Sequence, residues 1–177
     1  MKLAILDRDG VVNYDSAAYI KSPDEWRPIP GSLEAITRLN QAGYHVVLAT
    51  NQSGVGRGLF EMATLNAIHD KMHRALAEAG GRLDAIFFCP HAQEAECNCR
   101  KPRAGLLDEI ARRLNVPLEG VPVIGDARRD LEAAVTVGAR PILVLTGKGQ
   151  KTRREGELPP GTEVYASLAE AVDALLR

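Results

Sequence analysis

Two aspartates stand close together directly after the first apolar run of the chain. Asp7 and Asp9 follow residues 2–6, and Gly10 then lets the backbone turn sharply. If the strand geometry continues, both carboxylates lie on one face. Carboxylates this close repel one another, so a cation must lie beside them. Mg²⁺ suits the position because it binds a few protein oxygens together with substrate phosphate and water. The alternative is a solvated acidic turn.

A second pair of aspartates, Asp126 and Asp130, follows the apolar run 121–124. Asp126 is placed to give the same Mg²⁺ a further oxygen ligand. Asp130 lies one helical turn later, so we expect it to orient a lysine, an arginine or a water from behind the ligands. A solvated turn is again the alternative. The two pairs together predict a magnesium site that handles phosphate.

Three thiols and one imidazole gather within eleven positions: Cys89, His91, Cys97 and Cys99. Cys₃His is a ligand set of closed, structural zinc sites, whereas a catalytic zinc keeps an open position. The spacing differs from the usual Cys-x₂-Cys, and unrelated buried cysteines are the alternative. We expect structural Zn²⁺ here, with the loop folded around it aiming the adjoining Arg100 and Lys101 at the phosphate.

The elements that must position these residues can be read from the hydrophobic pattern. Apolar runs that predict buried strands occupy residues 2–6, 45–49, 84–88, 121–124 and 141–145. Amphipathic patterns lie between them, and the clearest predicts a helix near 61–79, ended by two glycines. Ser167 and Glu170 predict a capping box for the last helix. This alternation predicts an α/β fold, a Rossmann-like parallel sheet with helices on both faces.

Ligands of such sheets bind outside the carboxyl ends of the strands. Four predicted strands are followed by chemically useful side chains, which are Asp7, Thr50, Cys89 and Asp126. One aspartate after a strand could simply cap a helix, but several groups converging on one sheet edge predict an active site. Residues 147–161, rich in Gly, Pro and charge, predict a mobile loop.

The composition limits the classes of function that this chain could have. The chain has 177 residues, 45% hydrophobic and 25% charged, with a formal net charge of -1. We expect a single domain over 1–177 whose core needs no partner, and therefore a monomer. Without a basic excess or a long apolar run, we expect no nucleic acid and no membrane as partner. Three clustered cysteines indicate a reducing, cytoplasmic location.

In this order and on these strand ends, the motifs resemble those of the haloacid dehalogenase superfamily of phosphatases. The matching residues are Asp7-x-Asp9-Gly10, Thr50, Lys101 and Gly125-Asp126-x₃-Asp130. The superfamily usually has Thr where this chain has Val11, which removes one hydroxyl but no nucleophile or ligand. The resemblance covers nearly the whole chain and implies a haloacid dehalogenase-like fold.

The same resemblance implies a covalent mechanism. Asp7 would attack phosphorus and form an aspartyl-phosphate, with Asp9 acting first as acid and then as base. Mg²⁺ would be held by the Asp7 carboxylate, the Asp9 carbonyl and Asp126. Thr50, the Asn51 N–H and Lys101 would stabilise the phosphoryl oxygens.

The pattern Cys-Pro-His…Cys-x-Cys-Arg-Lys-Pro resembles one branch of the superfamily, which contains heptose bisphosphate and histidinol-phosphate phosphatases and lacks a large cap domain. Ser53 and Arg57 follow the heptose pattern, since the histidinol enzymes tend to carry Asp in place of Ser53. The substrate contacts so implied are Arg8, Asp15, Ser16, Ala17, Ala18, Asn51, Gln52, Ser53, Arg57 and Arg100.

The branch implies removal of the 7-phosphate from D-glycero-D-manno-heptose 1,7-bisphosphate, a cytoplasmic step toward the ADP-heptose of lipopolysaccharide core. Two alternatives stay open. One is a histidinol-phosphate phosphatase. The other, of a different class, is a zinc-stabilised binding protein with an inactive phosphatase site, although intact Asp7, Asp9 and Lys101 count against it.

Overall fold

The computed structural model describes residues 1–177 and contains one six-stranded sheet in the order β3-β2-β1-β4-β5-β6. Every neighbouring pair of strands is parallel. The strands are β1 (Lys2–Leu6), β2 (Tyr44–Asn51), β3 (Ala85–Cys89), β4 (Pro122–Gly125), β5 (Arg140–Val144) and β6 (Glu163–Tyr165). The chain order reverses between β1 and β4, so the crevice at their carboxyl ends is where a ligand is expected.

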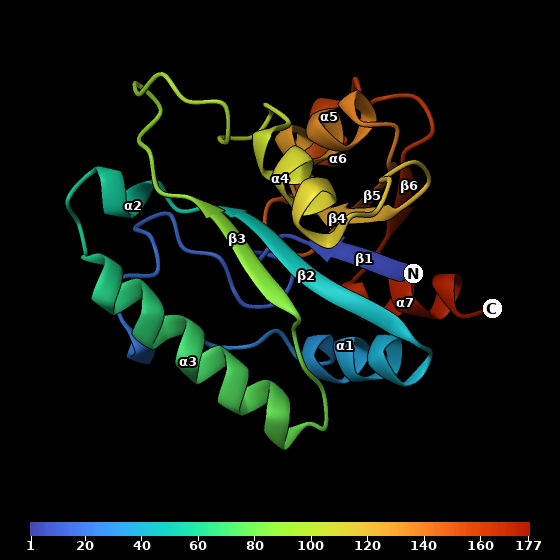
Figure 1. Ribbon diagram of the computed structural model, residues 1–177, viewed down its shortest axis with the longest axis horizontal. Coiled ribbons are helices and arrows are strands. Elements are labelled where there is room, and N and C mark those ends of the chain that lie inside the picture. The colour runs from blue at the N-terminus through green and yellow to red at the C-terminus, as the bar shows by residue number, and fades with distance from the viewer.

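Helices cover both faces of the sheet (Figure 1), which confirms the predicted α/β class. They are α1 (Ser32–Gln41), α2 (Ser53–Gly56), α3 (Met62–Glu78), α4 (Gly105–Leu114), α5 (Arg128–Thr136), α6 (Gly149–Glu155) and α7 (Leu168–Leu175), with a 3₁₀ turn, η1 (Pro23–Glu25). None of the helices has both the length and the apolar character that crossing a membrane would require.

The alternation of side chains along β1 divides the core into two layers. Ala4 and Leu6 pack with apolar residues of α1, α3 and α7. Leu3 and Ile5 point the other way and pack with residues of α4 and α5. Because successive strand residues face opposite sides, a strand buried on both faces needs an unbroken apolar run, as residues 3–6 provide. This rigid centre fixes the position of Asp7 at its end.

The segment after β5 differs from expectation. Where a mobile loop over 147–161 was predicted, the structure has helix α6, and a sixth strand, β6, follows it. Helix α6 has no apolar stripe to reveal it, since its buried positions are Gly149 and Thr152. The Thr152 hydroxyl donates to the Asp126 carbonyl at 2.9 Å, which ties this helix to the strand-end crevice.

The cap of the last helix also departs from expectation in detail. The Ser167 hydroxyl accepts from the Glu170 N–H at 3.3 Å, as a capping box requires. The Glu170 carboxylate, however, accepts from the N–H of Ala166 at 3.1 Å, one residue before the cap. Both groups still satisfy free backbone donors at the start of α7, so the cap signal located this helix.

Candidate active site

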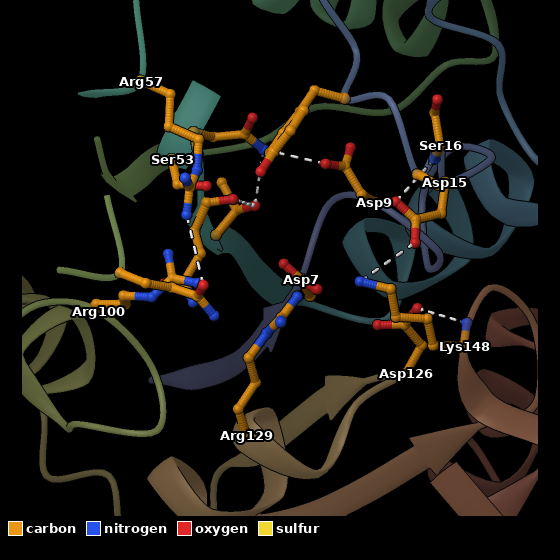
Figure 2. A pocket seen from close by; sticks show the side chains of 16 residues that line it. Asp7, Asp9, Asp15, Ser16, Ser53, Arg57, Arg100, Asp126, Arg129 and Lys148 are labelled. Carbon is orange, nitrogen blue, oxygen red and sulfur yellow. Dashed lines mark hydrogen bonds and ion pairs between the residues drawn. The ribbon is translucent and has the colours of Figure 1, made fainter. Parts of the chain in front are cut away.

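The side chains at the strand ends surround one polar cleft, called here the strand-end cleft (Figure 2). Twelve of its lining residues were expected from the sequence: Asp7, Asp9, Asp15, Ser16, Ala17, Thr50, Asn51, Gln52, Ser53, Arg57, Arg100 and Asp126. Four were not: Tyr19, Gln93, Arg129 and Lys148. Ala18 is exposed outside the lining. The convergence predicted from strand ends is therefore present for Asp7, Thr50 and Asp126, whereas Cys89 and the expected catalytic Lys101 lie outside the lining.

Asp7 occupies the switch point of the sheet. Its backbone N–H donates to the carbonyl of Ile124 on β4 at 2.9 Å, which continues the ladder between the strands just to the point where the chain turns away. The carboxylate is buried. Burial raises the pKa of Asp7 to about 6, while the nearby ammonium of Lys101 opposes this rise. A buried carboxylate of this kind is stabilised further by any added cation.

Asp126 faces Asp7 from the end of β4. Its Oδ2 accepts from the N–H of Lys148 at 2.9 Å. Burial raises the pKa of Asp126 to about 8, and the Asp7 charge adds to the rise. Oxygens of Asp7, Asp126 and Asp130 lie within 4.8 Å of one another. Two crowded, buried carboxylates whose pKa values are raised form a donor set that a divalent cation such as Mg²⁺ would stabilise.

Asp130 serves Lys101 and the backbone. Its Oδ1 accepts from the Lys101 ammonium at 2.6 Å, and its Oδ2 accepts from the Ala127 N–H at 3.1 Å. The Lys101 Nζ also lies 3.3 Å from Oδ1 of Asp7. Both oxygens of Asp130 are thus engaged, which matches the expected role of orienting a cation from behind the metal ligands.

The end of β2 fixes the loop that carries Lys101. The Asn51 side chain accepts from the Lys101 N–H at 3.0 Å and donates to the Lys101 carbonyl at 3.3 Å. The Thr50 hydroxyl accepts from the Gln52 amide at 3.1 Å. The side-chain amide of Asn51 is therefore engaged with the protein backbone and is not available to a ligand.

Asp9 is partly exposed to the cleft, and protein donors bind its carboxylate from the opposite side. Its Oδ1 accepts from Arg8 Nε at 2.8 Å and from Asn13 Nδ2 at 3.0 Å. Burial alone would raise the pKa of Asp9, but Arg8 and these hydrogen bonds hold it below its ordinary value. Arg8 itself is fully buried and does not line the cleft, so the expected substrate contact of Arg8 is corrected. Strand alternation explains this, since residue 8 faces away from residues 7 and 9.

Cations gather on another wall of the cleft. Arg100 and Arg57 line it together with Ser53 and Gln93. The Nη1 of Arg100 is buried without a hydrogen-bond partner, and burial chiefly lowers the pKa of this guanidinium. A buried donor with no acceptor costs free energy unless a ligand supplies one. This wall is accordingly suited to an anion.

Two of the unexpected residues bring further charge. Lys148 precedes α6 and places its Nζ 3.7 Å from Oδ2 of Asp15, which joins the segment before α6 to the loop after β1. Arg129, on α5, points toward Asp7 in Figure 2. Burial would lower the pKa of Arg129, but Asp130 and Asp7 hold it above its ordinary value. In the sequence both residues look like ordinary surface charges. Only the position of Arg129 beside Asp130 marks it as close to the site.

The thiol cluster assembles beside the cleft as the sequence predicts. The Cys89 sulfur lies 3.3 Å from His91 Nδ1 and 3.8 Å from the Cys97 sulfur, and His91 Nδ1 lies 3.2 Å from the Cys99 sulfur. All three cysteines are free. Tetrahedral zinc with bonds of about 2.1–2.3 Å separates its ligand atoms by roughly 3.4–3.8 Å. The Cys89 and Cys99 sulfurs lie only 2.8 Å apart and would have to separate on binding. The residue types and their convergence nevertheless fit Zn²⁺.

The chain is similar to known proteins over its whole length. A family model described as HAD-hydrolase-like matches residues 98–171. A D-glycero-beta-D-manno-heptose-1,7-bisphosphate 7-phosphatase from Bordetella bronchiseptica is 62% identical over 177 residues, which is 100% of this chain and 99% of the relative. Sequence similarity thus extends over the whole fold and its cleft.

Two crystal structures are also similar. One is the D,D-heptose 1,7-bisphosphate phosphatase from B. bronchiseptica, complexed with magnesium and phosphate, with a TM-score of 0.98 and 62% identity over 99% of this chain and 98% of that one. The other is the corresponding phosphatase from Burkholderia thailandensis, with a TM-score of 0.81 and 52% identity over 99% of each chain. The relative from Bordetella holds the metal and the anion that the cleft described here fits.

Proposed function

Because the chain belongs to the heptose-1,7-bisphosphate phosphatases of the haloacid dehalogenase superfamily, we propose that it hydrolyses the 7-phosphate of D-glycero-β-D-manno-heptose 1,7-bisphosphate. The observation that carries the proposal is one cleft with two kinds of anion-binding wall. Asp7 and Asp126 form the reacting wall, with the Lys101 ammonium buried 3.3 Å from Asp7, and Arg57 and Arg100 form the other. A bisphosphate presents an anion to each.

Asp7 is the nucleophile of the proposed reaction. Its carboxylate oxygen forms a bond to phosphorus as the bond from phosphorus to the C7 oxygen breaks, which leaves an aspartyl-phosphate. Asp9, which takes up a proton when the anionic phosphoryl group of the substrate lies beside it, gives that proton to the departing C7 oxygen. Asp9 then removes a proton from a water, whose oxygen bonds to phosphorus while the bond to Asp7 breaks. Inorganic phosphate leaves, and both carboxyl groups return to their starting states.

The other groups of the cleft position and stabilise. Lys101, oriented by Asp130, lies beside the Asp7 oxygen and neutralises charge on the phosphoryl group, together with Thr50 and the Asn51 N–H. The Asp7 carboxylate, the Asp9 carbonyl and Asp126 would hold Mg²⁺. When bound, that ion supplies positive charge between the anionic phosphoryl group and the anionic nucleophile.

The remaining contacts concern the sugar and the retained phosphate. We assign Arg57 and Arg100 to the 1-phosphate, since guanidinium pairs with phosphate through charge-assisted bonds and Arg100 has a buried donor to spare. Asp15 and Ser16, which line the cleft near Asp9, are placed to bind sugar hydroxyls. Ser53 adds a hydroxyl where an ammonium-bearing substrate would prefer a carboxylate.

The thiol cluster has a structural part in this proposal. Cys89, His91, Cys97 and Cys99 would hold Zn²⁺ and fix the loop before Arg100 and Lys101. We further propose one catalytic domain over 1–177 that acts as a cytoplasmic monomer. Both core layers close against the same sheet, and reduced thiols are typical of the cytoplasm.

Substrate comparison tests the proposal. Phosphate release is measured with Mg²⁺ for the heptose bisphosphate and for histidinol phosphate, in the wild type and in Asp7→Asn. We expect kcat/KM to be at least about 100-fold higher for the bisphosphate, because only it uses both anion-binding walls. The Asp7→Asn variant should fold and show no turnover. Preference for histidinol phosphate, or wild-type turnover by Asp7→Asn, would refute the substrate or the nucleophile respectively.

A further inference from the structure

Behind Asp9, on the side away from the cleft, lies a buried arginine with three acceptors. The Arg8 side chain is completely inaccessible to solvent. Its Nε donates to Asp9 at 2.8 Å, its Nη2 to Gln52 Oε1 at 3.2 Å, and its Nη1 contacts Nε2 of His69 at 3.1 Å. These acceptors come from three separate parts of the chain, namely the turn after β1, the end of β2 and helix α3.

The hydrogen bond from Arg8 fixes the chemical state of His69. A guanidinium has only N–H donors and no acceptor, so Nε2 of His69 must present its lone pair. The ring is therefore neutral with its proton on Nδ1. Its surroundings agree, because the side chain is only 7% exposed and its ring lies 6.4 Å from that of Phe88. Protonation of His69 would place a second positive charge directly beside the Arg8 guanidinium.

The same contacts connect His69 to the reacting groups. Gln52 accepts from Arg8 through its oxygen, which turns its amide nitrogen toward Asp9 Oδ2 at 3.3 Å and toward the Thr50 hydroxyl. Arg8 therefore binds one oxygen of Asp9 directly and contacts Gln52, which binds the other. An arginine has several rotatable bonds, so its orientation depends on every acceptor that holds it. His69 supplies the acceptor farthest from the cleft.

We propose that His69 is a positioning residue, which anchors the Arg8 guanidinium and thereby orients the Asp9 carboxyl toward the leaving oxygen. The inference rests on the proposed function, because it concerns the proton that Asp9 transfers. Its consequence is selective. Loss of the His69 acceptor should impair proton delivery to poor leaving groups, while attack by Asp7 on phosphorus stays intact.

Leaving-group dependence separates this role from general destabilisation. A sugar alkoxide needs a proton as it departs, whereas p-nitrophenolate departs without one. The value of kcat/KM covers steps only up to cleavage of the ester bond, so hydrolysis of the aspartyl-phosphate does not enter it. Comparing kcat/KM for the heptose bisphosphate and for p-nitrophenyl phosphate therefore isolates the proton given by Asp9.

The variants are His69→Phe, which keeps a ring but has no acceptor, and His69→Gln, whose side-chain oxygen can accept where Nε2 did. His73→Phe is the matched control, since His73 is exposed on the same helix. We expect His69→Phe to lose at least about 10-fold more on the sugar ester than on the aryl ester. His69→Gln should recover most of that difference, and His73→Phe should match the wild type on both.

Equal losses on the two esters, or no recovery with His69→Gln, would overturn the positioning role and leave His69 as a packing residue. Should circular dichroism show that His69→Phe is unfolded, His69→Leu, which also lacks an acceptor, is measured in its place beside His69→Gln. A wild type that hydrolyses p-nitrophenyl phosphate but not the heptose bisphosphate refutes the proposed substrate, and the same ratio is then measured with an alkyl phosphate that it does hydrolyse.

Discussion

The ammonium of Lys101 lies 2.6 Å from Oδ1 of Asp130, although the two residues are 29 positions apart in the sequence, and both side chains are buried. Burial alone would lower the pKa of Lys101, but the carboxylates of Asp130 and Asp7 hold it above its ordinary value. Lys101 therefore stays charged beside the nucleophile. Because the second oxygen of Asp130 is bound to the backbone at the start of α5, the position of the charge is fixed.

Removing either member of this pair should be costly and the losses should overlap. Lys101→Met leaves Asp130 buried and unpaired, and Asp130→Asn weakens the orientation of Lys101. Breaking such a pair costs roughly 3–5 kcal/mol, so we expect each single variant to lose stability of that order. The double variant should lose less than the sum. Urea denaturation of all four proteins measures the coupling, and strictly additive losses would contradict the pairing.

Stability of the magnesium-free protein should depend on pH through Asp126. Burial first, then Asp7, raises its pKa from 3.8 to about 8 in the folded state. The folded chain therefore holds a proton that the unfolded chain loses, and stability falls as pH rises from about 4 to about 8. Asp126→Asn abolishes this titration while its amide oxygen can still accept from Lys148.

The melting temperature of Asp126→Asn relative to wild type should consequently rise between about pH 5 and about pH 8, by roughly 2–4 °C for each kcal/mol of repulsion relieved. Thermal unfolding followed by circular dichroism in magnesium-free buffer measures this difference. An offset that stays constant over this range would show that Asp126 does not titrate there.

Zinc should matter more for activity than for global stability. Cys99→Ala removes one ligand and should loosen the loop before Arg100 and Lys101, whereas the two core layers stay closed. Elemental analysis of protein purified without added metal should find about one zinc per chain in the wild type. Glu96→Ala, an exposed change in the same loop, should keep both zinc and activity. Zinc-free wild type with full magnesium-dependent activity would contradict a structural zinc.

Gly147 should be irreplaceable for a steric reason. A Cβ there would lie 2.3 Å from Asp126 Oδ2 and 2.5 Å from the Cα of Gly10, at a φ of +56°. Gly120 also has a positive φ, +73°, but a Cβ there would meet nothing within 4 Å. Both alanine variants should lose about 1–2 kcal/mol from backbone strain. Only Gly147→Ala should also raise the Mg²⁺ concentration needed for half-maximal activity, and equal requirements would contradict the close packing.

Much of the site could be predicted because strand ends and ligand types are local features of sequence. Arg8 was expected to contact the substrate, yet it is buried and in contact with the buried His69. The side-chain periodicity of the strand and of the helix indicates this burial for both residues. Residue 8 alternates away from its neighbours, and residue 69 lies four positions after Leu65 on the apolar stripe of α3. Residues 147–155 gave no such signal, since hydrogen bonding rather than apolar packing fixes α6 and Lys148.

In the proposed reaction the phosphate on C7 is removed and the phosphate on C1 is kept. The most direct test is ³¹P NMR of the heptose 1,7-bisphosphate during turnover with Mg²⁺. We expect the resonance of the 7-phosphate to give way to inorganic phosphate in equal amount, while the resonance of the 1-phosphate persists in the product. Loss of the 1-phosphate instead, or of both phosphates at similar rates, would contradict the assignment of Arg57 and Arg100 to the retained anion and of Asp7 to the reacting one.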